Sequence, residues 1–269
     1  MSDHQALAPR SLYVMEWGKS GPHLVLLHGF GGLASVWADV AAAVSHNTRI
    51  IAYDLPGHGQ SLTFPGAGPV KLAVGAVLDD LTARGIAGFH LAGHSMGGAI
   101  ASLMAIAAPE RVRSLALLAP GGMGEEINGP VLHNFAAAVT EAELKMALSA
   151  MSAPGAAPPD TTLAALAESR RRAGQSAMLE TIAAGITRGG RQGVLSKDQL
   201  AALPMPLRVL WGTRDSVLPF AQALQMPGAF ELDAVEGAGH MLIEEAPERV
   251  TGMLLRAVLA DRGCPAALC

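Results

Sequence analysis

The 269-residue sequence is poor in charged residues, aromatic residues and cysteine. Only 16% of its residues are Asp, Glu, Lys or Arg, against about 25% in an average domain. The net charge of −4 gives no basic field for a nucleic acid or an anionic membrane surface. No stretch approaches the roughly 20 uncharged apolar residues of a membrane-spanning helix. We therefore expect neither nucleic-acid binding nor membrane insertion.

The only two cysteines, Cys264 and Cys269, lie at the end of the sequence. A disulfide there would hold only the tail, so cysteine usage does not indicate a secreted scaffold. Their spacing does not match a zinc pair, and residues 1–10 contain no apolar core of a signal peptide. The glycine-rich segment 29–32 does not have the spacing of a nucleotide site. We expect a cytoplasmic protein with no metal and no cofactor.

Apolar residues, in contrast, make up 50% of the sequence. This surplus over the charged residues predicts that some apolar surface stays exposed. A groove for an apolar substrate, a lid or a contact in a homo-oligomer would each use such a surface.

Short apolar segments alternate with helical patterns along most of the chain, which predicts an α/β protein with a mostly parallel sheet. The expected strands lie at 12–17, 23–27, 49–53, 89–92, 114–118, 207–211 and 230–235. We expect the first two to pair as a hairpin, because the residues between them have the composition of a turn. A single amphipathic helix over 244–259 is expected to close the fold.

The alternation stops between 121 and 204, where only helical patches separated by proline and glycine are found. Asp160 is a candidate N-cap for a helix through Arg172. An insertion this long exceeds the connections of about two to six residues usual in α/β units and favours a functional lid. We expect a helical cap at 121–204 over a core formed by 1–120 and 205–269. The alternative is a second small domain with no role at the site.

The sequence Gly-His-Ser-Met-Gly-Gly at 93–98 lies between a strand pattern and a helical pattern. A G-x-S-x-G motif in that context is typical of a nucleophile elbow, a strained turn that lifts the serine oxygen above the sheet. Glycines two residues before and after Ser95 would allow strand and helix to approach closely. Ser95 is therefore the candidate nucleophile.

A serine nucleophile needs a base and usually a carboxylate that orients the base. In this architecture the order along the chain is serine, acid, histidine, each following a strand. Asp215 follows the pattern at 207–211, and His240 is the only histidine after it. Asp233 and Asp198 are weaker acid candidates, since neither follows a strand. His94, next to the nucleophile, is expected to point away from the elbow.

An oxyanion hole needs two N–H groups aimed at the developing negative charge. We expect them from the backbone of Met96, the residue after the nucleophile, and of Phe30 in the early glycine-rich loop. His28 is expected to hold this loop by hydrogen bonds. The candidate pocket walls, chosen by residue type, are His28, Met123, Phe135 and Leu218, together with Phe30 and Met96.

The sequence resembles the α/β-hydrolase superfamily from about Leu12 to Leu259. The residues that carry the resemblance are His28-Gly29-Phe30, Asp-Leu-Pro-Gly-His-Gly-Gln-Ser at 54–61, the elbow at 93–98, Asp215 and Gly239-His240. Segment 118–129 is also similar to the hydrolase domain of acetoin-dehydrogenase acyltransferase-type proteins. The resemblance implies a sheet of about eight strands with a helical cap inserted after the sixth.

The resemblance further implies an acyl-enzyme mechanism in which Ser95 attacks a carbonyl, His240 moves the proton and water releases the acid. Our leading hypothesis is a serine hydrolase of a small or medium carboxylic ester or thioester, whose partner is that acyl substrate. The same triad also serves carbon–carbon bond hydrolysis of diketones, acyl transfer and peracid formation. Two hypotheses from other classes are a non-catalytic ligand-binding protein and an accessory protein of an acetoin-type dehydrogenase system.

Overall fold

Seven strands form one sheet in the computed structural model, which describes residues 11–227 and 230–259. They are β1 (Val14–Trp17), β2 (His23–Leu27), β3 (Arg49–Tyr53), β4 (Phe89–His94), β5 (Val112–Leu118), β6 (Leu207–Gly212) and β7 (Phe230–Val235). Their order in the sheet is β1-β3-β2-β4-β5-β6-β7. β1 is antiparallel to β3 and all other neighbours are parallel. The expected α/β fold with a mostly parallel sheet is confirmed.

The N-terminal end of the sheet differs from the expectation. β1 and β2 do not form a hairpin, because β1 pairs with β3 and β2 lies between β3 and β4. Burial gives the reason: four of the five residues of β2 are buried, whereas β1 is half-buried and suits the edge of a sheet. The sheet has seven strands instead of about eight, and the cap follows the fifth strand, not a sixth.

Helices cover both faces of the sheet. On one face α1 (Ala38–Val44) packs against α10 (Pro247–Leu259); on the other α3 (Met96–Ala107) packs against α2 (Val70–Ala83) and α8 (Lys197–Ala201). The helix expected over 244–259 is two helices, α9 (Leu242–Glu245) and α10, because proline at the start of α10 cannot continue a preceding helix. The 3-10 turns are η1 (Ala34–Trp37), η2 (Ser45–Asn47), η3 (Gly59–Ser61), η4 (Arg188–Gly190) and η5 (Phe220–Gln225).

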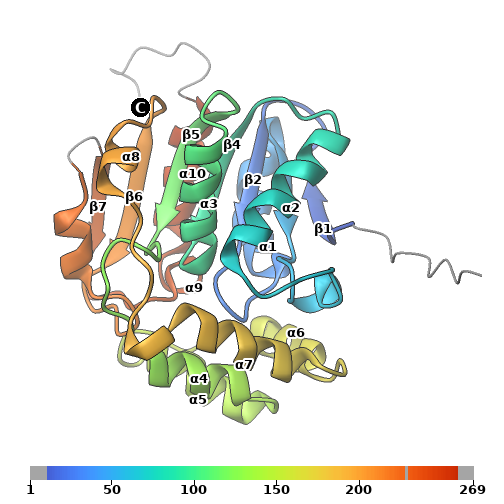
Figure 1. Ribbon diagram of the computed structural model, residues 1–269, viewed down its shortest axis with the longest axis vertical. Helices are drawn as coiled ribbons and strands as arrows, with labels where there is room; N and C mark the ends of the chain where they lie inside the picture. Colours follow the sequence, from blue (N-terminus) through green and yellow to red (C-terminus); the bar gives the residue numbers. More distant parts are fainter. Residues whose placement is uncertain (1–10, 228–229, 260–269) are drawn as a thin grey trace, which may run out of the picture.

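Four helices between β5 and β6 lie together at the carboxyl end of the strands, and we call them the cap (Figure 1). They are α4 (Gly129–Ala137), α5 (Glu141–Met151), α6 (Asp160–Arg170) and α7 (Gln175–Ile186). α4 packs against α5 and α7, and α5 packs against α6. Asp160 is not an N-cap but the first residue of α6, because Pro159 takes the cap position; the helix ends at Arg170 instead of Arg172.

Within the segment 121–204, the helices divide between the two parts of the molecule. α4 to α7 form the cap, whereas α8 packs against α3 of the core. Capping side chains fix the first two cap helices: Asn128 accepts from the N–H of Val131, and Thr140 and Glu143 form a capping box at the start of α5. α4 and α5 thus each begin at a capping residue encoded in the local sequence.

Candidate active site

Ser95 lies on a strained turn between β4 and α3. Its φ of 53° and ψ of −116° are rarely adopted by a residue with a side chain. A Cβ atom at Gly93 would lie 2.2 Å from the carbonyl oxygen of Gly97, and one at Gly97 would lie 2.4 Å from that of Leu27. Both distances are far below van der Waals contact, so only glycine fits these positions. The turn has the geometry expected of a nucleophile elbow.

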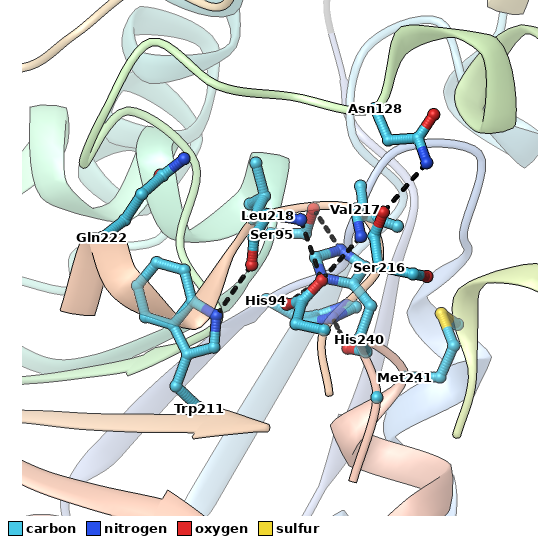
Figure 2. A network of polar contacts seen from close by, with 12 residues as sticks. His94, Ser95, Asn128, Trp211, Ser216, Val217, Leu218, Gln222, His240 and Met241 are labelled. Carbon is cyan, nitrogen blue, oxygen red and sulfur yellow. Dashed lines mark hydrogen bonds and ion pairs between the residues drawn. The ribbon is translucent and has the colours of Figure 1, made fainter. Parts of the chain in front are cut away.

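Ser95, His240 and Asp215 form a continuous chain of hydrogen bonds. Ser95 and His240 point toward each other in Figure 2. Nε2 of His240 lies 2.9 Å from Oγ of Ser95, and its Nδ1 lies 2.7 Å from Oδ2 of Asp215. The side chains of His240 and Asp215 are 3% and 0% exposed. A carboxylate at Nδ1 keeps the ring proton there, which leaves Nε2 as an acceptor for the serine proton.

The carboxylate of Asp215 is itself held by its own loop. Its Oδ1 accepts hydrogen bonds from the backbone N–H groups of Val217 and Leu218, both at 2.8 Å. The carbonyl of Leu218 in turn accepts from Nε1 of Trp211 at 3.1 Å (Figure 2). These bonds fix Oδ2 toward the histidine.

The two competing acids lie away from this constellation. Asp233 forms an ion pair with Arg249 at the surface, and Asp198 is exposed on α8. Asp215 is thus the one of the three acid candidates that contacts His240.

Two backbone N–H groups beside Ser95 are free to hold an oxyanion. Those of Phe30 and Met96 donate to no acceptor within residues 11–227 and 230–259. Met96 is the first residue of α3, where helix geometry leaves N–H groups unpaired. Phe30 belongs to a turn closed by the bond from Gly32 N–H to Gly29 carbonyl oxygen, and a Cβ atom at Gly29 would lie 3.3 Å from Cβ of Ser95.

Two buried histidines hold the loop that carries Phe30. His28 donates from Nδ1 to the carbonyl of Gly29 at 2.7 Å and accepts at Nε2 from the N–H of Leu55 at 3.0 Å. His58 accepts at Nε2 from the N–H of Gly31 at 3.1 Å. Burial lowers the pKa of both histidines, which keeps them neutral and able to accept. Both ring nitrogens of His28 are therefore occupied in holding the loop.

His94 lies against His240, contrary to the expectation that it points away from the site. The two ring centroids are 4.9 Å apart, and Nε2 of His94 donates to the carbonyl oxygen of His240 at 2.9 Å (Figure 2). Burial, followed by the charge of nearby His240, lowers the pKa of His94 to about 3. His94 is thus a neutral donor that positions the backbone of His240.

Glu245 on α9 holds the loop that carries the histidine. Its Oε2 accepts from the N–H groups of Gly239 at 2.8 Å and Ala153 at 2.9 Å, and its Oε1 accepts from that of Met241 at 3.0 Å. Two of these donors flank His240, and the third, Ala153, lies two residues after the end of cap helix α5. One carboxylate therefore joins the histidine loop to the cap.

The cap makes further bonds to the loops that carry the base and the acid. His240 donates from its backbone N–H to the carbonyl of Met151 at 2.8 Å. Ser216, next to the acid, donates from Oγ to the carbonyl of Ala150 at 2.8 Å, and its own carbonyl accepts from Nδ2 of Asn128 at 3.0 Å (Figure 2). The cap thus contacts both loops of the constellation directly.

Two cavities meet at Ser95, with Phe30 and Leu132 lining both. The cavity that also contains His240, which we call the base-side cavity, has a volume of about 530 Å³. The one that contains Met96, the elbow-side cavity, has a volume of about 1100 Å³. The serine is therefore accessible from two sides.

The candidate pocket residues divide between these cavities. His28 and Phe135 line the base-side cavity, and Leu218 lines the elbow-side cavity. Met123 lines neither cavity, and its side chain packs in the apolar core.

Among the described residues, no group of three or more His, Cys, Asp or Glu side chains is arranged to hold a metal ion. No helix in the described ranges is long and apolar enough to cross a bilayer. The expectation about Cys264 and Cys269 falls outside the described residues.

Comparison with known proteins decides the family. Residues 24–252 match the model of the alpha/beta hydrolase family. The chain belongs to the α/β-hydrolase family. This hydrolase is similar to the meta-cleavage product hydrolase from Pseudomonas fluorescens IP01, with a TM-score of 0.83 and 18% identity over 93% of this chain and 94% of that one. At that identity the likeness concerns the fold alone.

Curated relatives of this α/β hydrolase include proteins of acetoin cleavage and ester hydrolysis. It is 38% identical over 239 residues to a dihydrolipoyllysine-residue acetyltransferase component of the acetoin cleaving system of Pseudomonas putida, covering 88% of this chain but only 64% of that protein. It is 30% identical over 214 residues to a pimeloyl-[acyl-carrier protein] methyl ester esterase of Vibrio campbellii, covering 76% and 80%. The expected resemblance to acetoin-type acyltransferase proteins is confirmed.

Proposed function

We propose that this α/β hydrolase is a serine esterase that cleaves a small or medium carboxylic ester or thioester through an acyl-enzyme on Ser95. The observation that carries the proposal is the hydrogen-bond chain from Ser95 through His240 to Asp215, next to two unpaired backbone N–H groups. The esterase from Vibrio campbellii supports ester substrates. The chain spans only 64% of the length of the acetyltransferase component from Pseudomonas putida, so that relative does not support a role in acetoin cleavage.

In the first half of the reaction, Oγ of Ser95 attacks the carbonyl carbon while its proton passes to Nε2 of His240. The resulting oxyanion accepts hydrogen bonds from the N–H groups of Phe30 and Met96; one such donor contributes about 3 to 4 kcal/mol in known serine hydrolases. The bond to the leaving oxygen or sulfur then breaks, and His240 donates the proton to that atom.

In the second half, water attacks the acyl-enzyme carbonyl and gives one proton to His240. The bond between the acyl carbon and Oγ breaks, the carboxylic acid leaves, and Ser95 regains the proton from His240. Asp215 stays ionised throughout and stabilises the charged ring. No group beyond the chain's own residues and water is needed to balance these steps.

The test is turnover of p-nitrophenyl esters from acetate to octanoate by the wild type and by Ser95→Ala, with phosphonate labelling of both. We expect turnover with a burst, labelling at Ser95, and a loss of at least about a thousandfold in the variant. Labelling without turnover of any ester would contradict ester hydrolysis and favour diketone hydrolysis or acyl transfer. Absence of both would favour a non-catalytic ligand-binding protein.

A further inference from the structure

The two cavities differ in the catalytic groups that they contain. The base-side cavity is lined by His240, Met241 and His94, and Met96 is not among its lining residues. The elbow-side cavity is lined by Met96, Gly121 and Leu218, and His240 is not among its lining residues. Because the base is accessible from one side only, the two sides are not equivalent for a bound ester.

The chemistry of ester cleavage assigns the two halves of the substrate to these sides. The leaving oxygen must receive a proton from Nε2 of His240, so it has to lie within hydrogen-bond reach, about 2.6 to 3.2 Å, of that atom. The alcohol attached to it then extends into the cavity that His240 lines. The acyl chain, on the opposite side of the same carbon, extends past Met96.

Charge along the walls adds a second argument. The charged residues lining the elbow-side cavity, among those described, are Lys71 and Arg188, both exposed and neither in an ion pair with a described residue. Apart from histidines, the titratable residues lining the base-side cavity are the acids Asp39 and Glu244; burial raises the pKa of Glu244 to about 8, so Asp39 carries the negative charge there at neutral pH. An anionic group on the substrate is therefore attracted to the elbow side and disfavoured on the base side.

Building on the proposed esterase function, we infer that the acyl group of the substrate occupies the elbow-side cavity and the alcohol occupies the base-side cavity. The wall of the elbow-side cavity includes the aliphatic side chains of Leu103, Ile127 and Ile186, and its two cations are exposed. The substrate class that fits is an ester whose acyl chain is aliphatic and carries a carboxylate at its far end.

Two matched variants test the assignment of the halves. Gly185→Leu on α7 narrows the elbow-side cavity, and a Cβ atom there meets nothing within 4 Å, so a side chain can start at this position without backbone strain. Ala165→Leu on α6 narrows the base-side cavity. One substrate series varies the acyl group, p-nitrophenyl acetate to octanoate; the other varies the alcohol, ethyl to octyl acetate.

We expect Gly185→Leu to lower the ratio of kcat/KM for octanoate over acetate at least tenfold, since each buried methylene is worth about fourfold. The ratio along the alcohol series should not change in this variant, and Ala165→Leu should show the opposite pattern. A reversed pattern, or equal effects of both variants on both series, would overturn the assignment. Wild-type turnover of p-nitrophenyl acetate reports separately on the proposed function.

A second comparison tests the charge of the acyl group. At low salt we expect the wild-type kcat/KM for the p-nitrophenyl monoester of octanedioic acid to be at least about fivefold higher than that for p-nitrophenyl octanoate. This ratio should decrease at high salt, which screens the attraction between charges. The double variant Lys71→Ala, Arg188→Ala should lose this preference. Lys145→Ala, Arg172→Ala, which removes two exposed cap cations that line neither cavity, should keep it. No preference in the wild type, or the same loss in both double variants, would overturn the anionic class.

Discussion

The backbone N–H of His240 donates to the carbonyl oxygen of Met151, 2.8 Å away, and this bond crosses from the core to the cap. Met151 is the last residue of α5, and the last turn of a helix has carbonyls without partners inside the helix. The cap therefore supplies an acceptor that the histidine loop uses. Glu245 reinforces the link by accepting from Gly239 and Ala153 together.

Glu245→Gln should impair the enzyme by misplacing His240. An amide has one acceptor oxygen where the carboxylate has two, so the three N–H groups that Glu245 now satisfies cannot all keep their bonds. Because small displacements of a reacting group are costly, we expect kcat/KM to fall about a hundredfold, mainly through kcat. The measurement is the pH profile of kcat/KM, whose acidic limb should shift.

Glu248→Gln is the matched control, since Glu248 is exposed on α10. It should keep both the rate and the pH profile of the wild type. A folded Glu245→Gln variant with an unchanged profile would show that the carboxylate has only a structural role.

Asp215→Asn should remove most activity and leave the fold intact. Its remaining oxygen can still accept from Val217 and Leu218, whereas its NH2 group would donate to Nδ1 of His240 and place the ring proton on Nε2. That tautomer cannot accept the proton of Ser95, and the analogous change in a serine protease lowers kcat about 10⁴-fold. Steady-state ester kinetics measure the loss, and Asp233→Asn, at the surface, should behave as wild type. Comparable losses in both variants would argue against Asp215 as the orienting acid.

Stability should fall with acid below about pH 6.5, because burial lowers the pKa of His28, His58 and His94. These rings are neutral when folded and take up protons when unfolded, so their contribution is complete above the unfolded pKa and decreases as the pH falls. As the pH falls, each of these histidines lowers the free energy of unfolding by up to about 1.4 kcal/mol per pH unit. For His94 this loss continues until the pH reaches its pKa of about 3.

Urea unfolding at pH 7.5, 6.0 and 5.0 measures this dependence. His94→Gln should reduce the slope, whereas His46→Gln, at an exposed position, should leave it unchanged. A free energy of unfolding that stays constant or rises as the pH drops from 6.0 to 5.0 would contradict the prediction.

Gly97→Ala should destabilise the protein by about 3 kcal/mol, because its Cβ atom would meet the carbonyl oxygen of Leu27 at 2.4 Å and neither backbone can yield easily. Gly75→Ala makes the same chemical change in α2 where nothing lies within 4 Å, and should stabilise by about 0.5 to 1 kcal/mol. Urea denaturation compares them. Equal effects of both would mean that the elbow tolerates a side chain at residue 97.

Those parts of the molecule that have a local signal could be predicted from the sequence. The elbow, the acid and the histidine each follow an apolar strand pattern, and parallel strands bring such positions to one edge of a sheet. The partner of β1 could not be predicted, since composition marks a chain reversal but not which strand will be adjacent.

The positioning roles of Glu245 and His94 could not be predicted from the sequence, for two reasons. A single helix over 244–259 gives no reason to assign Glu245 a role at the site, although Pro247 signals a helix start at that point. The orientation of His94 depends on where His240 returns in space, which no local pattern encodes. Residue type alone likewise could not tell that Met123 faces the core while Phe135 faces a cavity.

The chain leaves the sheet for the cap after β5 and returns at β6, and these two strands are direct neighbours. Because these strands are parallel, the chain leaves at the carboxyl end of β5 and returns at the amino end of β6, so the sheet fixes both ends of the excursion. Doubling its length would cost only about 0.6 kcal/mol of chain entropy. Asn128, Ala150, Met151 and Ala153, which bond to the catalytic loops, have to be kept. The same holds for Gln175, whose side chain bonds to Gly57 and Gly59, and for α8, which packs against α3. The remaining parts of the cap can be exchanged without loss of the fold, so related proteins can acquire new substrates through changes in this region.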